Sequence, residues 1–525
     1  MYRILVAGFV CLALPAPAAA QESVEQRLER LERELEAQRE ENERQREQLE
    51  GQRQELEEQG ADDAQLKQEV QKQKISAQDS AKLSLVGGRP TITSADGRSS
   101  ISLRAVVQLD AAHYDQDAQQ PLAEDFRRGS VGGAGNREVT SARDLSDGAY
   151  FRRARMGFEG VIAEEFNFRF LGEFGGSGTE GPARINDAWI NYVGFAPFTF
   201  QMGAFSPSAN LDDATSQEEL MFPERSTPSE LSRTLGGADG RIGAALRSSG
   251  QRWMQSVAFT TRTVADAEGA DSAANLVGRL GLLPLTGSDY DVHVGANGTY
   301  TIIPPDAGSS ARPGVRYSVR FRDRPELRVD STRLIDTGSI DADHAYNAGA
   351  ELGLRWRSVY LQAEYFWYGI DPKSSLDAPS FDAFYAQVGW FLTGESRRYN
   401  PVNGSFQMPR PFVPVSWAPF GYGAWELAFR YSNTDLDSRR GHQGELAGPN
   451  AVRGGLQQVY TAGLNWYLNG NFRMSFNYYY VDVDRLNPAS AANPTPFGAA
   501  PATPPPGVQI GQRYHVIGIR SQFNF

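Results

Sequence analysis

The sequence predicts an all-β fold, a transmembrane antiparallel β-barrel of about 16 strands, with an N-terminal α-helical coiled-coil segment. From about residue 98, segments of about 10–14 residues alternate polar with apolar side chains and are separated by turn residues. The connections alternate between short and long. The chain ends on Phe525, with Phe523, Ile519 and Ile517 on one face of the last segment. Short turns at one end, long loops at the other and a terminal aromatic strand are together typical of outer-membrane barrels.

Residues 1–20 are predicted to be a secretory signal peptide. Arg3 supplies the positive charge, Ile4–Leu14 the apolar core, and Ala18–Ala20 a small-residue cleavage site before Gln21. Cys11, the only cysteine in the chain, lies inside this segment. The mature chain therefore has no thiol for a disulfide, a metal site or a nucleophile.

Residues 21–82 are charged, lack proline and carry a heptad pattern, which predicts a periplasmic coiled coil. One register places apolar residues at most a positions, whereas the middle d positions are glutamines. Such polar layers favour a trimer over a tight dimer, and a solvated acidic stalk is the alternative. The a positions are Leu28, Leu35, Asn42, Leu49, Leu56 and Val70. Residues 83–97 are predicted to be a linker.

Residues 98–525 are predicted to form the barrel, and its strand number follows from parity. Seventeen segments have the strand pattern, but a barrel with both ends in the periplasm needs an even number. The strand directions counted forward from the first strand agree with those counted backward from the last strand only if residues 304–343 form one extracellular loop. About sixteen strands then remain. The same count places Gly394–Gly421 on the periplasmic side. The candidate strands are Ile101–His113, Tyr150–Val161, Phe166–Phe174, Ile185–Phe195, Phe198–Phe205, Arg241–Ser248, Trp253–Arg262, Asn275–Leu283, Tyr290–Ile303, Val315–Arg324, Tyr346–Trp356, Val359–Ile370, Phe381–Leu392, Tyr422–Asn433, Leu456–Leu468, Phe472–Val483 and Tyr514–Phe525.

Composition excludes several other classes. The chain has 525 residues, a formal charge of −12 and a mean hydropathy of −0.46, and no apolar run is long enough for a spanning helix. A soluble β-sandwich would explain the strands, but not the signal peptide, the terminal Phe and the loop asymmetry together. Because the net charge is negative, any attraction of anions must come from a local field.

The segment Gly314–Arg324 (GVRYSVRFRDR) is expected to be extended, with its basic residues on one face. Side chains two apart on a strand lie about 7 Å apart on the same face. Four guanidinium groups then form a ladder of fixed charge that suits phosphate-like oxyanions. The alternative is that Arg is simply abundant, since only five of the 52 basic residues are Lys. The basic face comprises Arg316, Arg320, Arg322 and Arg324.

Several stretches together make residues 98–525 resemble the phosphate-selective porins O and P. The resemblance implies a sixteen-stranded trimeric barrel whose lumen is lined by an arginine ladder and narrowed by infolded loops. The stretches are YFRRARMGFEG (150–160), LIDTGSIDADHAYNAGAELG (334–353), FYAQVGWFLTGESRRY (384–399), GYGAWELAFRYSNTDLD (421–437) and GLNWYLNGN (463–471).

The resemblance also assigns roles to matching arginines. Arg152-Arg153 match a paired Arg on an early strand of the family, and Arg320, Arg322 and Arg328 match an Arg-x-Arg with a further Arg six residues on. By strand alternation alone, Arg153 and Arg155 face the lumen and Arg152 points toward the outer rim. The family often has a lysine near its first constriction loop, after a Gly-x-Phe segment. Gly203–Ser206, the similar place here, has none, which puts tight phosphate selectivity in doubt.

The loop Ser206–Asp239 is the candidate constriction. It carries Arg225 and Arg233 together with several carboxylates, which either set up a transverse field across the lumen or form ordinary loop salt bridges. The carboxylates are Asp212, Asp213, Glu218, Glu219 and Glu224.

The sequence therefore predicts an outer-membrane channel for phosphate or related oxyanions, polyphosphate included. No catalytic constellation, metal-ligand spacing, cofactor motif or nucleic-acid site is expected. The expected partners are the oxyanions, outer-membrane lipid, two further copies in a homotrimer, and peptidoglycan through the coil. The alternatives are a broader channel for organic anions or small polar solutes, and an envelope tether with an incidental barrel. The predicted anion-binding residues are Arg152, Arg153, Arg155, Arg225, Arg316, Arg320, Arg322, Arg324 and Arg328.

Overall fold

The computed structural model of the chain describes residues 24–78, 80–116, 145–176, 183–264, 271–308, 315–374, 377–488 and 507–525. The chain divides into two units, Met1–Ser80 and Ala81–Phe525, which are considered separately. The predicted signal peptide, residues 1–20, lies outside the described residues.

In the first unit, the described residues form one helix, α1 (Val24–Gln78), of 55 residues. The predicted helix is thereby confirmed, whereas its association into a coiled coil stays a prediction. The heptad leucines Leu28, Leu35, Leu49 and Leu56 are each more than half exposed, so the apolar seam is open to a partner helix. Within the described part of the chain, we find no helix with the length and hydrophobicity of a membrane span.

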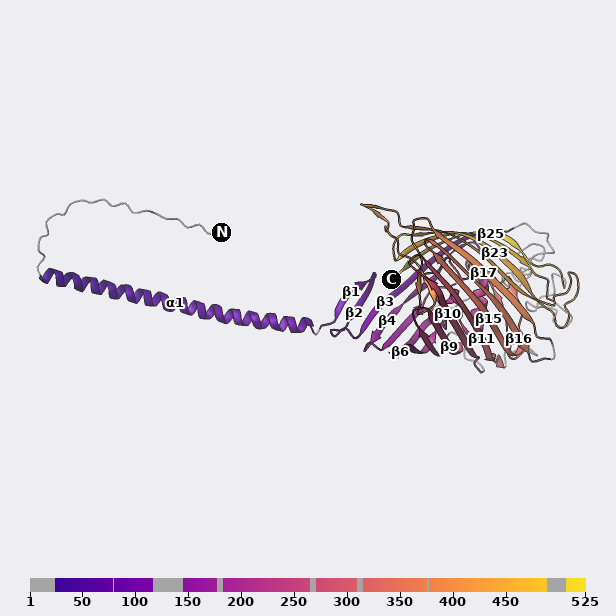
Figure 1. Ribbon diagram of the computed structural model, residues 1–525, viewed down its shortest axis with the longest axis horizontal. Helices are drawn as coiled ribbons and strands as arrows, with labels where there is room; N and C mark the ends of the chain where they lie inside the picture. Colours follow the sequence, from indigo (N-terminus) through magenta and orange to yellow (C-terminus); the bar gives the residue numbers. More distant parts are fainter. Residues whose placement is uncertain are drawn as a thin grey trace, which may run out of the picture. The chain divides into compact units, whose positions relative to one another are not determined.

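The second unit is a closed antiparallel barrel of 16 strands, as the sequence predicts. Neighbouring strands in the chain pair with one another, and the last strand pairs with the first to close the barrel (Figure 1). Closure leaves no free strand edge in the wall. The barrel strands are β3 (Ser100–Gln116), β4 (Gly148–Ile162), β5 (Phe166–Glu173), β6 (Arg184–Phe195), β7 (Phe198–Phe205), β8 (Arg241–Ser249), β9 (Trp253–Thr263), β10 (Ala274–Thr286), β11 (Tyr290–Ile303), β15 (Ile340–Trp356), β16 (Val359–Pro372), β17 (Ser380–Phe391), β22 (Ala424–Ser438), β23 (Val452–Tyr467), β24 (Phe472–Asp484) and β25 (Arg513–Asn524).

Side chains alternate along these strands as a lipid-facing wall requires. In β17, for example, Val388 and Trp390 are exposed on the outside, whereas Gln387 is buried inside. Trp425 and Trp466 stack at 5.1 Å between ring centroids near one rim. Aromatic rings at this level are typical of the membrane interface.

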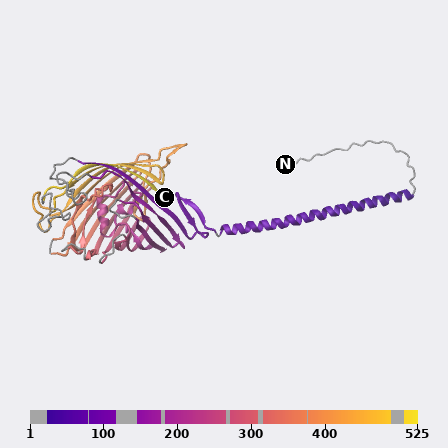
Figure 2. The ribbon, with the colours of Figure 1, turned by 180° about the vertical axis from the view of Figure 1, so that it is seen from behind.

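The two rims of the barrel differ in their connections. At the short-turn rim, compact turns such as 163–165, 250–252, 357–358 and 468–471 join the strands, and the C-terminus lies there (Figures 1 and 2). The long-loop rim is at the other end. By analogy with outer-membrane barrels, the short-turn rim faces the periplasm.

Residues 83–97, which we expected to be a linker, instead form a hairpin of β1 (Lys82–Val86) and β2 (Arg89–Thr93). Gly87 and Gly88 both have positive φ, which matches the tight turn that right-twisted strands favour. β2 pairs with β3, so the hairpin extends the barrel sheet. The linker prediction was wrong because Gly87 and Gly88 form a tight turn between two short strands that pair with each other.

Among the described residues, three connections carry short elements of their own. The first, between β7 and β8, contains α2 (Leu211–Ala214) and α3 (Thr227–Gly236). The second joins β11 to β15, as the parity argument predicted, and contains β12 (Ser318–Val319), β13 (Arg322–Asp323) and β14 (Ile335–Asp336). The third joins β17 to β22 at the short-turn rim. Its elements are β18 (Arg398–Asn400), β19 (Ser405–Gln407), β20 (Ser416–Trp417) and β21 (Phe420–Gly421).

The interior is filled by these connections. Phe321, Leu334 and Ile335 of the second connection are fully buried and cluster with the inward-facing Phe366 and Tyr368 of β16. The barrel is therefore a wall around a packed interior with local cavities.

Candidate functional site

Strand β4 brings three arginines to the interior through a β-bulge. Its register with β3 pairs Arg153 with Gln108 and Phe151 with Leu109, so Arg152 is the extra residue. A bulge turns a side chain that alternation would place outside. Arg152 is accordingly only 4% exposed, and the expectation that it points toward the outer rim was wrong. Arg153 and Arg155 face inward as predicted.

The loop between β7 and β8 lies inside the barrel, as expected for a constriction. Its backbone carbonyls are bound by wall arginines from the other side of the lumen. Arg473 donates to the carbonyl of Leu220 at 2.6 Å, and Arg430 donates to the carbonyl of Glu224 at 3.0 Å. The carboxylate of Glu364 on β16 accepts hydrogen bonds from the first backbone N–H groups of α2. These contacts hold the loop across the lumen.

Four arginines surround a single carboxylate, that of Glu224. Arg152 donates to it at 2.9 Å, Arg520 at 2.6 Å and Arg153 at 3.4 Å, and Arg328 lies 3.5 Å away. These arginines come from β4, β25 and the β11–β15 connection, so three parts of the chain converge here. The side chains of Glu224 and of these four arginines are all buried or nearly so.

A second group of charges lies next to the first. Asp239 accepts from Arg155 at 3.0 Å and from Arg233 at 2.9 Å. Glu230 lies 3.0 Å from both Arg233 and Arg328. Arg328 therefore connects the two groups through its contacts with Glu224 and Glu230.

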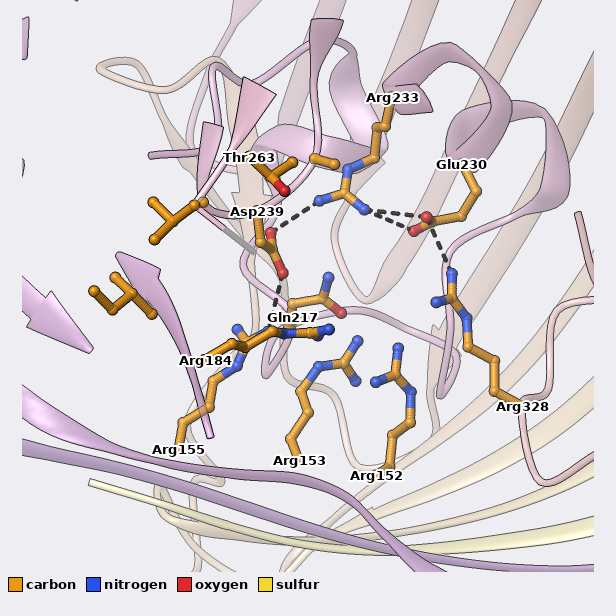
Figure 3. A pocket seen from close by; sticks show the side chains of 14 residues that line it. Arg152, Arg153, Arg155, Arg184, Gln217, Glu230, Arg233, Asp239, Thr263 and Arg328 are labelled. Carbon is orange, nitrogen blue, oxygen red and sulfur yellow. Dashed lines mark hydrogen bonds and ion pairs between the residues drawn. The ribbon is translucent and has the colours of Figure 1, made fainter. Parts of the chain in front are cut away.

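Both groups border one cavity, which we call the inner cavity, of about 210 Å³ (Figure 3). Six arginines line it against two carboxylates, Glu230 and Asp239. Figure 3 shows Arg152, Arg153 and Arg328 directing their guanidinium groups toward the same space. The lining arginines are Arg152, Arg153, Arg155, Arg184, Arg233 and Arg328.

The inner cavity has an excess of positive charge. Burial alone raises the pKa of the Glu224 carboxyl, but Arg152, Arg153 and Arg520 outweigh burial and hold this pKa well below its usual range. Glu224 is therefore ionised. Asp110 also binds Arg520 and Glu230 also binds Arg328, so the four arginines face three carboxylates and keep a local charge of about +1. Within the described residues, Nε of Arg153 has no hydrogen-bond partner. The cavity can thus receive an anion that competes with Glu224 for guanidinium donors.

The predicted arginine row does not form one strand. The segment is extended only over β12 and β13, with a break between them, and three of its four basic residues bind three different neighbours. Arg316 pairs with Asp306 at 2.7 Å, Arg320 pairs with Asp336, and Nε of Arg324 donates to the carbonyl of Ser331 at 2.9 Å. A regular ladder on one face was therefore a wrong expectation.

Two arginines of this row line a different space, which we call the outer cavity. It has a volume of about 500 Å³ and lies near the ends of β8, β9, β10 and β11 at the long-loop rim. Asp271 and Asp306 are its carboxylates. Its arginines are Arg241, Arg262, Arg320, Arg322 and Arg333.

Arg225 is not part of either cavity. Its guanidinium donates to the backbone carbonyls of Asp212, Asp213 and Thr215 inside its own loop. Among the loop carboxylates, Glu218 pairs with Arg104 of the wall. Arg225 and Glu218 therefore form salt bridges and hydrogen bonds that hold the loop.

Some arginines of the site were absent from the sequence prediction. Arg184 lies at the first position of β6, where no alternation pattern precedes it. Arg520 had a usable signal, because it alternates with the outward Ile517 and Ile519 in the last strand. In the described part of the chain, no cluster of His, Cys, Asp and Glu is suited to a metal ion.

Comparisons with known proteins agree with this architecture. The family model of the phosphate-selective porins O and P matches residues 133–499. Porin O of Pseudomonas aeruginosa is 25% identical over 360 residues, which cover 66% of this chain and 80% of that protein. An uncharacterised protein of Caulobacter vibrioides is 26% identical over 356 residues, 66% of this chain; the match spans 65% of its length, just under two thirds.

Among solved structures, an anion-selective porin from Comamonas acidovorans aligns with 81% of this chain and 100% of its own, with a TM-score of 0.46 and 11% identity. The family match extends over well more than half of the chain and includes β4, the β7–β8 loop and Arg328. The chain therefore belongs to the phosphate-selective porin O and P family.

Proposed function

We propose that this protein lets phosphate or related oxyanions, polyphosphate included, diffuse passively through its barrel by way of the inner cavity. The observation that carries the proposal is the group of four arginines around Glu224, beside a cavity lined by six arginines. Guanidinium groups bind tetrahedral oxyanions through paired hydrogen bonds. Membership of the family supports an integral outer-membrane porin that acts as a channel.

Two arginine-lined cavities suit passage better than storage. The outer cavity has a volume of about 500 Å³ and the inner cavity about 210 Å³, and both are lined by residues at the ends of β8 and β9. In each, carboxylates offset part of the positive charge, so binding is favourable and yet reversible. Conduction requires sites with this intermediate affinity. Arg152, Arg153, Arg155 and Arg328 would bind the anion at the inner cavity, and Arg320 and Arg322 at the outer one.

The proposal is tested by recording single channels in planar bilayers. Under a chloride gradient, the reversal potential should show preference for anions, and added phosphate should reduce the chloride current in a saturable way. A cation-selective reversal potential would contradict the proposal, as would a chloride current that phosphate leaves unchanged.

The selectivity should depend on pH through Glu219 of the β7–β8 loop. Burial, reinforced by the neighbouring Glu218, raises the pKa of the Glu219 carboxyl to about 7. Lowering the pH from 8 to 6 then removes a negative charge from the lumen, so anion preference should increase. The reversal potential measured at several pH values checks this. Glu219→Gln should keep the increased preference at every pH, and an unchanged titration in this variant would exclude Glu219.

Replacing Arg320 and Arg322 together with Ala should slow the entry of anions from the long-loop rim. The change removes two positive charges from the outer cavity and leaves the Asp336 carboxylate without its Arg320 partner. Steering by such charges acts on association rates and is screened by salt. The association rate of phosphate block should fall several-fold at low ionic strength and little at high salt. An equal reduction of the association rate at low and at high ionic strength would indicate a structural defect.

A broader channel for organic anions is the second candidate. It is favoured by Gly203–Ser206, which has no lysine where the family often has one. Competition separates the two candidates. Phosphate at low concentration should displace a small organic anion from the channel only if the channel prefers phosphate.

We further propose a homotrimer in which α1 of three copies forms a periplasmic coiled coil. The exposed heptad leucines support self-association. A charged coil of 55 residues would span about 80 Å at 1.5 Å per residue. This reach makes peptidoglycan a candidate partner of its distal end.

A further inference from the structure

The connection between β17 and β22 ends in a hairpin that projects from the short-turn rim. β20 and β21 pair through Ser416 with Gly421 and Trp417 with Phe420. In Figures 1 and 2 this orange hairpin extends beyond the rim, away from the barrel wall. The rest of the same connection turns inward, where Arg397 pairs with Glu426 on β22.

The hairpin is apolar, uncharged and uncovered. Its segment Val413–Gly423 (VPVSWAPFGYG) contains no charged residue. Trp417 is 92% exposed and Phe420 73%, and Phe412 just before the segment is also largely exposed. A soluble protein rarely presents a Trp and a Phe in this way unless they contact a partner or a membrane.

The hairpin is fixed to the lipid-facing aromatic girdle. The indole N–H groups of Trp425 and Trp466, which stack on each other, both donate to the carbonyl of Tyr422 at 3.1 and 2.9 Å. The backbone N–H of Val415 donates to the carbonyl of Leu468 in the β23–β24 turn at 2.8 Å. The apolar surface of the hairpin thus continues from a surface that already faces lipid.

We propose that this hairpin is a membrane anchor whose tip, Trp417 and Phe420, inserts into the interface of the periplasmic leaflet. Aromatic rings, Trp above all, prefer the headgroup level of a bilayer, and an uncharged segment has no cost of burying a charge there. The anchor belongs to the β17–β22 connection, of which Arg397 and its neighbours pack inside the barrel at the same rim. Membrane attachment would therefore hold the outer part of a segment whose inner part packs inside the barrel.

The absence of cysteine from residues 21–525 permits a direct test. Trp417→Cys is labelled with the environment-sensitive dye NBD and reconstituted into vesicles of phosphatidylethanolamine and phosphatidylglycerol. Quenching is then measured with doxyl-labelled phospholipid in the bilayer and with iodide on both sides of it. Phe429→Cys on the lipid-facing wall of β22 is the lipid control. Ser288→Cys, in the exposed β10–β11 turn of the same rim, is the aqueous control.

The label at position 417 should be quenched by the doxyl lipid to an extent similar to that at position 429, and should resist iodide. Quenching by iodide, as expected at position 288, would overturn the proposal. Protection from both quenchers would also overturn it, because another copy of the chain would then cover the hairpin. Phe420→Cys provides a second reporter, so that the test does not depend on one substitution folding correctly.

Discussion

Phosphate should block the chloride current about tenfold more strongly after Glu224→Gln. The carboxylate is surrounded by Arg152, Arg153, Arg328 and Arg520, and it competes with any anion for these donors. Removing a unit charge about 4 Å away is worth up to about 4 kcal/mol at an effective dielectric constant near 20. Water and salt reduce this to about 1.4 kcal/mol, which corresponds to a factor of about ten. The measurement is the phosphate concentration that halves the single-channel chloride current.

Glu164→Gln is the matched control for this substitution. It removes the same charge from a residue whose side chain is 66% exposed in the β4–β5 turn, outside both cavities. Block should be unchanged in this variant. If the two variants behaved alike, the effect would reflect total charge, and the inner cavity would not be the site of block.

The largest loss is expected from the double substitution Arg152→Gln with Arg153→Gln. It removes two guanidinium groups from the inner cavity, and each hydrogen bond to a charged group contributes about 1.5–3 kcal/mol. Phosphate block should weaken about 100-fold, or about 3 kcal/mol. Arg328 and Arg520 still pair with Glu224 in this variant, so the carboxylate is not left unpaired and the loop should remain in place.

The control for this pair is Arg357→Gln with Arg513→Gln. Both arginines are exposed, with side chains 70% and 58% accessible, and lie at opposite rims. Their loss changes the net charge equally but should leave block within about twofold. A double variant of Arg152 and Arg153 that retained wild-type block would show that anions pass elsewhere.

The barrel itself was predictable from the sequence because its constraint is local and periodic. Lipid outside and polar filling inside impose a period of two on every strand, so segments such as Phe381–Leu392 and Phe472–Val483 closely match β17 and β24. Parity then reduced seventeen candidates to sixteen strands and identified residues 304–343 as a loop. The N-terminal helix followed from its heptads in the same way.

Arg152 shows the limit of predicting side-chain direction from strand alternation. Alternation holds only while the register is regular, and one extra residue opposite Gln108 and Leu109 reverses the direction of a side chain. The arginine row failed for a related reason. Three arginines of the row bind residues up to sixteen positions away along the chain, namely Asp306, Asp336 and Ser331. Each of these contacts turns one arginine away from the face that a regular strand would give it.

The sequence by itself determined that this chain forms an outer-membrane barrel, that arginine is its main cation and that the loop Ser206–Asp239 is the candidate constriction. Only the tertiary structure decided which arginines meet. Those around Glu224 come from β4, β25 and the β11–β15 connection, hundreds of residues apart. A guanidinium group attracts any carboxylate that geometry brings near, so its partner depends on barrel closure and loop path. Neither is encoded in the spacing of residues along one strand.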